Sequence, residues 1–170
     1  MGTWNFLWFL TKKVATGALI GITVSDRFAS IVSINGMSMH PTLTPGSTTL
    51  MGWLKGDQVL LEKFCLDKYE FSHGDIVVFK SPSNYKETCI KRLIALPGDW
   101  MKVPETYEII EIPVGHCWVE GDNAASSLDS RTFGPIPLGL IQGRAVCIIW
   151  PPERACKVER RIPEGRISSY

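Results

Sequence analysis

The sequence predicts a mainly β fold, a small barrel or sandwich, preceded by an N-terminal membrane-anchoring helix. Short apolar runs rich in β-branched residues recur after residue 41, and Gly-Asp or Pro-Gly turns separate them. No long amphipathic helical pattern accompanies these runs. Residues 1–34 are instead largely apolar and contain a single acidic side chain, Asp26. We therefore divide the chain into an N-terminal segment (1–34), a β domain (35–150) and a charged C-terminal tail (151–170).

Composition places the chain among globular proteins with one core. Its 170 residues suffice for one domain, 45% of them are hydrophobic, 21% are charged, and the formal net charge is +1. No basic stripe stands out, so we predict no nucleic-acid partner. Five cysteines without a Cys-x-x-Cys pair argue against a disulfide framework and against a zinc site, although one bridge is left open. The three histidines are scattered, and none has a metal-ligand partner at helical spacing.

Two placements are open for a membrane-spanning helix near the N-terminus. Such a helix needs about 20 apolar residues, and no uninterrupted run of that length occurs. A span over 6–24 would bury Lys12 and Lys13, at roughly 3 kcal/mol each. We predict a span at about 14–34, which carries the adjacent and pairable Asp26 and Arg27 and leaves the lysines to mark the inner side. The alternative is a helix that lies on the membrane surface or on a partner protein.

The predicted strands follow one another through the β domain. Apolar runs lie at 58–64, 76–79, 88–96, 117–120 and 144–150, and most are bounded by Gly, Pro or Asp. Beyond residue 152 charged side chains dominate and apolar ones are few. We therefore predict that 151–170 are a frayed tail or a docking arm.

One hydroxyl stands out as a candidate nucleophile. Ser38 lies between Met37 and Met39, with Gly36 before it and Pro41 after it. Gly36 permits backbone angles closed to other residues, and Pro41 fixes its own φ, so this stretch can turn sharply and hold a small side chain in one pose. A serine in a Gly/Pro turn is most often a turn residue only, so the chemical interpretation requires a base.

Lys91 is the stronger of two candidate bases for Ser38. His116, close to the polar block at 121–123, keeps a Ser-His-Asp arrangement open. Lys91 stands in an otherwise apolar strand, where alternation places it on the face of Cys89 and turns Arg92 to the other face. Desolvation there lowers the pKa of a lysine, and a neutral amine can accept the serine proton. The alternative is a lysine whose amine reaches the rim of the sheet.

The polar stretch 121–135 supplies further candidates. Asp129 and Arg131 can form an ion pair, and the hydroxyls of Ser126, Ser127 and Ser130 can orient an amine. Almost every position is small, polar or turn-forming, so the alternative is a long solvated surface loop.

Together these segments resemble the four conserved boxes of the membrane-bound type I signal peptidases. They occur in the order of that family, and four independent segments at compatible spacing make the resemblance highly specific. The matching residues lie within 35–137: Ser38-Met39-x-Pro41-Thr42-Leu43, Gly74-Asp75-Ile76-Val77-Val78-Phe79, Lys91-Arg92-Leu93-Ile94-Ala95-Leu96-Pro97-Gly98-Asp99, and Gly121-Asp122-Asn123-x-x-x-Ser127-x-Asp129-Ser130-Arg131-x-Phe133-Gly134-Pro135.

The resemblance implies a fold, a reaction and a set of roles. The fold would be that of a signal-peptidase-like catalytic domain with a hydrophobic surface near the bilayer. Ser38 would be the nucleophile, Lys91 the general base and Ser127 the hydroxyl that orients the lysine amine. An ion-pair scaffold beneath the site would consist of Asp129, Arg131 and Arg92. The remaining supporting residues would be those in the loop of the nucleophile, namely Gly36, Met39 and Pro41. The reaction would be peptide-bond hydrolysis through an acyl-enzyme, with no metal or organic cofactor.

Within that family, the mitochondrial inner membrane peptidase, and in particular its second subunit, is the likeness we favour. Lys91 argues against the endoplasmic reticulum branch, and the short stretch 100–120 leaves no room for the second domain of bacterial members. The implied protein is single-pass in the mitochondrial inner membrane, with its catalytic domain facing the intermembrane space. Presequence-bearing proteins would be its substrates, and a sister catalytic subunit would complete a heterodimer.

Three other interpretations stay open. In the first, the chain is a signal peptidase of another compartment, of bacterial or plastid type. In the second, it is a non-catalytic assembly subunit of a peptidase complex. The third is a self-cleaving Ser–Lys repressor, but the sequence shows no helix-turn-helix region and no self-cleavage linker.

Gly36 departs from the family pattern. Many bacterial members carry a serine two residues before the nucleophile, and its hydroxyl donates a hydrogen bond to the oxyanion. Gly36 has no side chain to donate, so the Ser38 N–H acts with some other donor or the oxyanion hole is weaker. Removing one such donor typically costs roughly 100- to 1000-fold in rate.

Overall fold

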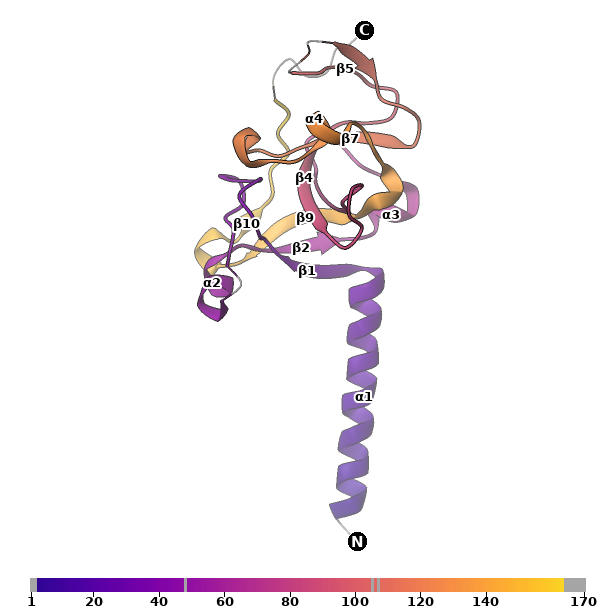
Figure 1. Cartoon of the computed structure of the whole chain (residues 1–170). Coiled ribbons are helices and arrows are strands. Elements are labelled where there is room, and N and C mark those ends of the chain that lie inside the picture. The colour runs from indigo at the N-terminus through magenta and orange to yellow at the C-terminus, as the bar shows by residue number, and fades with distance from the viewer. Residues whose placement is uncertain (1–2, 48, 105, 107, 164–170) are drawn as a thin grey trace.

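One long helix and one curved β-sheet dominate the chain (Figure 1). The computed structural model describes residues 3–47, 49–104, 106 and 108–163. The helix α1 (Thr3–Arg27) extends away from the β body, and its side chains from Trp4 to Thr23 are exposed. The predicted mainly β class with an N-terminal helix is confirmed.

The described strands form one antiparallel sheet and one separate hairpin. The sheet has the order β1-β2-β9-β3-β4-β7-β8 with β10 on β9, and β5 and β6 form the hairpin. Register shifts between β2 and β9, β3 and β9, and β4 and β7 bend it into an open half-barrel with β1 and β8 at its edges. The strands are β1 (Ala29–Ser33), β2 (Gln58–Glu62), β3 (Ile76–Lys80), β4 (Thr88–Ala95), β5 (Trp100–Lys102), β6 (Ile109–Glu111), β7 (His116–Glu120), β8 (Ile136–Pro137), β9 (Ile141–Trp150) and β10 (Cys156–Lys157).

Short helices join these strands. The α-helices after α1 are α2 (Leu50–Lys55), α3 (Cys65–Lys68) and α4 (Ser130–Phe133). The 3-10 turns are η1 (Ala124–Ser126), η2 (Leu138–Leu140) and η3 (Pro152–Arg154). The polar stretch 121–135 is therefore built from η1, α4 and their connections.

The apolar part of α1 lies earlier in the chain than the sequence predicts. The helix is long and apolar enough to cross a membrane between Trp4 and Thr23, with a mean hydropathy of 1.2. A helical span at about 14–34 is not formed, because Ala29–Ser33 is β1 and pairs with β2. Arg27 forms an ion pair with Asp67, with a nitrogen–oxygen distance of 3.1 Å. The side chain of Asp26, its predicted partner, lies outside the described part of the chain.

Lys12 and Lys13 lie inside the apolar window of α1 and not beside it. The ammonium of Lys12 lies 5.0 Å from the ring centre of Trp8, and that of Lys13 lies 4.5 Å from the ring centre of Phe9. Such cation–π contacts offset part of the cost of removing an ammonium from water. Because the lysines do not flank the window, they give no sign of which end faces inward.

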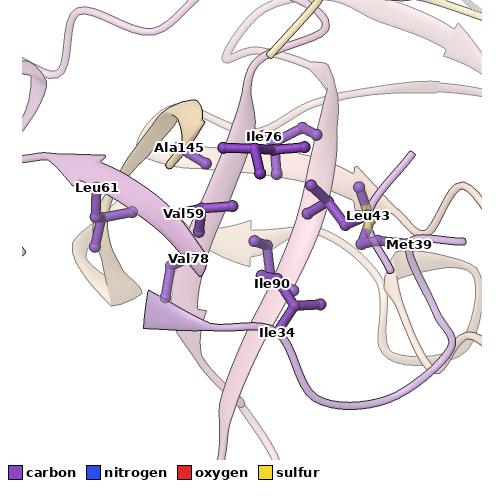
Figure 2. Close-up of a cluster of buried hydrophobic side chains, with 10 residues drawn as sticks. Ile34, Met39, Leu43, Val59, Leu61, Ile76, Val78, Ile90 and Ala145 are labelled. Carbon is purple, nitrogen blue, oxygen red and sulfur yellow. The ribbon is translucent and has the colours of Figure 1, made fainter. Parts of the chain in front are cut away.

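A buried apolar cluster ties the Ser38 loop to the sheet. Figure 2 shows Met39 and Leu43 pointing into the same core as Val59 of β2 and Ile76 of β3. Alternation along β3 sends Ile76 and Val78 into this cluster and sends Val77 and Phe79 into a second one on the opposite face. Both faces of β3 are therefore buried, and packing of the sheet fixes the loop that carries Ser38.

The C-terminal segment 151–163 is an arm docked on the sheet, which corrects the alternative of a frayed tail. β10 pairs with β9, and Arg154 Nε lies 2.8 Å from the buried Asp57 Oδ1. The carbonyl of Glu159 accepts a hydrogen bond of 3.0 Å from Arg92 on β4. Residues 164–170 of the predicted tail lie outside the described residues.

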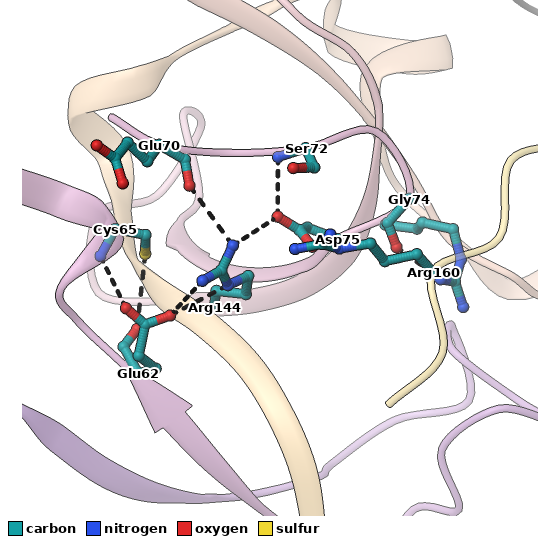
Figure 3. A network of polar contacts seen from close by, with 9 residues as sticks. Glu62, Cys65, Glu70, Ser72, Gly74, Asp75, Arg144 and Arg160 are labelled. Carbon is teal, nitrogen blue, oxygen red and sulfur yellow. Dashed lines mark hydrogen bonds and ion pairs between the residues drawn. The ribbon is translucent and has the colours of Figure 1, made fainter. Parts of the chain in front are cut away.

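The buried carboxylate of Asp75 joins this arm to β9. Figure 3 shows Arg144 of β9 between Glu62 and Asp75, with ion-pair distances of 2.7 and 3.1 Å. Asp75 also receives Arg160 of the arm at 2.6 Å and the Ser72 N–H at 2.9 Å. A buried carboxylate needs such partners, because an uncompensated charge in the interior is costly.

Candidate active site

The loop of Ser38 turns sharply after β1. Gly36 has a φ of +86°, a region that favours glycine. The His40 N–H donates to the Met37 carbonyl at 3.1 Å, and the Leu43 N–H donates to the Met39 carbonyl at 2.9 Å. The turn therefore holds Ser38 between Gly36, which has open space where a Cβ would be, and the buried side chains of Met39 and Leu43.

Ser38 and Lys91, paired from sequence alone, are in contact. Lys91 Nζ lies 2.7 Å from Ser38 Oγ and 3.1 Å from the carbonyl oxygen of its own neighbour, Ile90. Lys91 lies on β4, opposite Val77 of β3, and only 5% of it is exposed. The alternative of an amine at the rim of the sheet is therefore wrong.

Burial lowers the pKa of Lys91 below its ordinary value. The neighbouring Cys89 and the Asp129 carboxylate act in the opposite direction, and Arg131 adds to the lowering. The distance of 2.7 Å between Lys91 Nζ and Ser38 Oγ is short enough for a neutral amine to accept the hydroxyl proton.

Asp129 is the buried centre of the polar stretch. It is fully buried and accepts hydrogen bonds from Arg131 Nη2 at 2.6 Å, the Gly121 N–H at 2.8 Å and Ser127 Oγ at 2.5 Å. Burial alone would raise the pKa of Asp129, but these hydrogen bonds outweigh it and hold that pKa below its usual range. Asp129 therefore stays ionised beneath the site.

The Ser127 hydroxyl donates a hydrogen bond to Asp129. Among the hydrogen bonds of the described residues, none joins the Ser127 hydroxyl to the lysine amine, so its orienting role remains a prediction. Ser127 is nevertheless close to Ser38, since a Cβ added to Gly121 would touch Ser127 Oγ and lie 2.6 Å from the Ser38 carbonyl oxygen. Only glycine fits between the polar stretch and the Ser38 loop.

The predicted ion-pair scaffold is two separate pairs. Asp129 pairs with Arg131, whereas Arg92 pairs with Asp122 through two hydrogen bonds of 2.8 and 2.7 Å. Asp122 also accepts a hydrogen bond of 2.5 Å from Thr42 Oγ1. Arg92 therefore stabilises the far end of the Ser38 loop through Asp122, from the face of β4 opposite Lys91.

Sequence reasoning missed the roles of Asp122 and Asn123. The Asn123 N–H donates to the Ser38 carbonyl at 2.9 Å, and Asn123 Nδ2 donates to the Met37 carbonyl at 3.1 Å. Both residues directly follow Gly121, where the close approach requires a glycine. Their place in the Gly-Asp-Asn motif was the available signal, but a motif does not say which carbonyls its side chains reach.

The hydrogen bonds of two histidines are to partners other than Ser38. His116 Nδ1 lies 3.2 Å from the Val114 carbonyl, and His73 Nε2 lies 2.6 Å from Asp99 Oδ2. None of the hydrogen bonds of the described chain joins a histidine side chain to Ser38. Within the same residues, no group of three His, Cys, Asp or Glu side chains is placed to hold a metal ion.

A groove of about 620 Å³ is lined by both Ser38 and Lys91. Its walls come from β1 (Ser30–Ser33) and β4 (Thr88–Lys91), with Leu61 and Val78 between them in chain order. β1 is an edge strand, so its outer backbone groups can pair with an extended peptide. The arrangement can therefore hold an extended chain next to an activated hydroxyl.

Comparison with known proteins identifies the family. The family described as "Signal peptidase, peptidase S26" matches residues 7–107 and 100–150. Mitochondrial inner membrane protease subunit 2 of Mus musculus is 40% identical over 148 residues, covering 86% of this chain and 82% of that protein. The subunit 2 protein of Saccharomyces cerevisiae is 42% identical over 136 residues, covering 78% and 75%.

A relative of the other subunit type is similar as well. Mitochondrial inner membrane protease subunit 1 of Schizosaccharomyces pombe is 42% identical over 131 residues, covering 75% of this chain and 78% of that protein. The extent of the family match and the coverage of these relatives lead to one conclusion. The chain belongs to the signal peptidase family, peptidase S26.

Proposed function

We propose that the chain is a membrane-anchored serine endopeptidase with a Ser–Lys dyad. It removes targeting presequences from proteins delivered to the mitochondrial intermembrane space. The observation that carries this proposal is the 2.7 Å distance between Lys91 Nζ and Ser38 Oγ at a lysine that is 5% exposed. Membership of a signal peptidase family and the mitochondrial relatives supply the substrate class.

The chemistry follows from the two side chains. A neutral Lys91 takes the Ser38 proton as the hydroxyl oxygen attacks the scissile carbonyl carbon. The Ser38 N–H, which donates no hydrogen bond within the described residues, stabilises the oxyanion. The protonated amine then passes its proton to the leaving nitrogen, and a water molecule, activated by the same amine, releases the acyl group from Ser38.

The anchor and the relatives support a location and a partner. α1 would hold the enzyme in the mitochondrial inner membrane with the β domain in the intermembrane space, where its substrates arrive. Relatives named as subunit 1 and as subunit 2 suggest a complex, and we propose a heterodimer with a sister catalytic subunit. Protease added to mitochondria with a ruptured outer membrane should degrade the β domain, and protection of that domain would contradict this orientation.

Cleavage by matched variants tests the enzymatic proposal. Full-length chain purified in detergent is given a presequence-bearing precursor, and the new N-terminus is sequenced. Ser38→Ala and Lys91→Ala should each abolish cleavage. Ser83→Ala and Lys68→Ala, at exposed positions that do not line the groove, are the controls and should cleave normally.

Full cleavage by either dyad variant would contradict the proposal. The same variants separate the enzyme from a non-catalytic assembly subunit. If cells that lack this chain and receive Ser38→Ala process every substrate, the chain acts through assembly and not through catalysis.

A further inference from the structure

Resting on the proposed function, we infer that Asn123 is a positioning residue for the oxyanion. Its side chain holds the peptide group between Met37 and Ser38 in the orientation that aims the Ser38 N–H at the developing negative charge. It acts through that peptide and does not touch the reacting atoms.

Asn123 binds the backbone on both sides of the nucleophile. Asn123 Nδ2 donates to the Met37 carbonyl at 3.1 Å, and the Asn123 N–H donates to the Ser38 carbonyl at 2.9 Å. One residue thus fixes the two peptide groups that flank the Cα of Ser38. The side-chain bond is the part that a substitution can remove without touching the backbone bond.

The orientation of the Ser38 N–H follows from the geometry of one peptide group. The Met37–Ser38 bond is trans, so its carbonyl and its N–H point in opposite directions. When Asn123 draws the Met37 carbonyl toward itself, the Ser38 N–H turns to the other side. That N–H donates no hydrogen bond to any described residue, so it is free to meet an oxyanion.

The residues on the N-terminal side of this peptide group are not tightly packed. Gly36 lies just before it with a φ of +86° and open space where a Cβ would be, and Met37 is 47% exposed. Among the described residues, the Met37 carbonyl accepts hydrogen bonds from Asn123 Nδ2 and from the His40 N–H. Since Gly36 offers no side-chain hydroxyl to the oxyanion, catalysis depends more strongly on the orientation of the Ser38 N–H.

Asn123 is itself carried on a rigid segment. Asp122 is held by two hydrogen bonds from Arg92, and the Gly121 N–H donates to the buried Asp129 at 2.8 Å. The backbone that carries the Asn123 side chain is therefore fixed, and a side chain can orient a peptide group only from such a fixed position.

Steady-state kinetics of two variants test this inference. Asn123→Asp keeps the size and the backbone N–H but replaces the donor NH₂ with an acceptor, and Asn123→Ala removes the side chain. Each should lower kcat by roughly 10- to 100-fold, somewhat less than loss of an oxyanion donor. KM, the pH at which activity reaches half its maximum and the midpoint of thermal unfolding should not move. Asn84→Ala, in an exposed loop, is the matched control and should match the unaltered chain.

The outcomes separate this inference from the function it rests on. Normal kcat in both Asn123 variants, with Ser38→Ala inactive, overturns the positioning role and leaves the peptidase intact. A lower midpoint of unfolding in both, or a fall in activity carried by KM or by a shifted pH profile, also overturns it. Full activity of Ser38→Ala overturns the proposed function itself.

Discussion

Lys91 and Arg92 are neighbours on β4, and the contrast between them shows how one strand places two buried cationic side chains in different environments. Both are cationic side chains and both are buried, at 5% and 2% exposure. Arg92 faces the Asp122 carboxylate and the carbonyls of Gly74 and Glu159. Within the part of the chain that the structure describes, the hydrogen-bond partners of Lys91 are a hydroxyl and a carbonyl.

The difference in partners decides what each charge can do. A carboxylate compensates the Arg92 guanidinium, which therefore remains a structural cation. Lys91 has no carboxylate within hydrogen-bonding distance among the described residues, so burial lowers its pKa and makes the neutral amine accessible. Alternation along the strand keeps the two environments apart.

The largest expected effect comes from giving position 91 a permanent charge. Lys91→Arg should reduce kcat/KM at least about 1000-fold, because a guanidinium does not lose its proton and general-base catalysis contributes up to roughly 10,000-fold. Cleavage of a presequence peptide by the full chain measures this. Activity above a tenth of the unaltered value would mean that Lys91 is not the base.

A change on the other face of β4 should instead affect stability. Arg92→Met leaves Asp122 without its cation and should lower the free energy of unfolding by about 3 kcal/mol. Denaturant unfolding of the full chain in detergent, followed by tryptophan fluorescence, measures the loss. Arg161→Met, which removes an exposed ion pair, is the control and should change it by about 0.5 kcal/mol or less. Equal losses in the two variants would contradict the structural role of Arg92.

The pH dependence of cleavage sharpens the same contrast. Activity should rise with pH as Lys91 loses its proton, by about tenfold per unit on the acidic limb. Burial lowers the pKa of Lys91 from the ordinary 10.5, so the limb should end below that value. A rate that does not change from acidic to alkaline pH would rule out a lysine base.

The smallest expected effect is that of Lys91→Met on stability. The folded chain has the lowered pKa, so the unfolded chain binds more protons between that pKa and 10.5, and stability rises with pH in this window. Methionine of similar volume should remove this pH dependence and change the free energy of unfolding by about 1.5 kcal/mol or less. A loss as large as that of Arg92→Met would show that Lys91 serves the fold.

The β domain and the burial of Lys91 could be predicted because their signals are local, whereas the pairing of Lys91 with Ser38 depended on the resemblance to a family. Short apolar runs between turns indicate strands, and a lysine within such a run indicates a buried amine. The predicted span was placed too late in the chain because residues 28–34 are mostly apolar, and such a stretch is compatible with a helix or with a strand. Only the pairing of β1 with β2 decides between the two. Periodicity cannot report that pairing.

Long-range contacts account for the other differences. Arg92 pairs with Asp122 and not with Asp129, because β4 and β7 bring Asp122 to the face of β4 opposite Lys91. The arm is held by Arg154 and Arg160, whose partners Asp57 and Asp75 are far away in sequence. From sequence alone a charged segment is expected to be solvated, because the buried carboxylates that pair with it are not known.

The protonation state of the amine at position 91 can be measured directly. Lysine labelled with ¹³C at Cε and ¹⁵N at Nζ is introduced into the full chain in micelles, and the resonance lost in Lys91→Arg is assigned to this side chain. We predict one lysine that titrates below 10.5 and whose titration shifts when Ser38 is replaced by alanine. A Lys91 resonance that titrates with the exposed lysines, and does not respond to Ser38→Ala, would contradict the dyad.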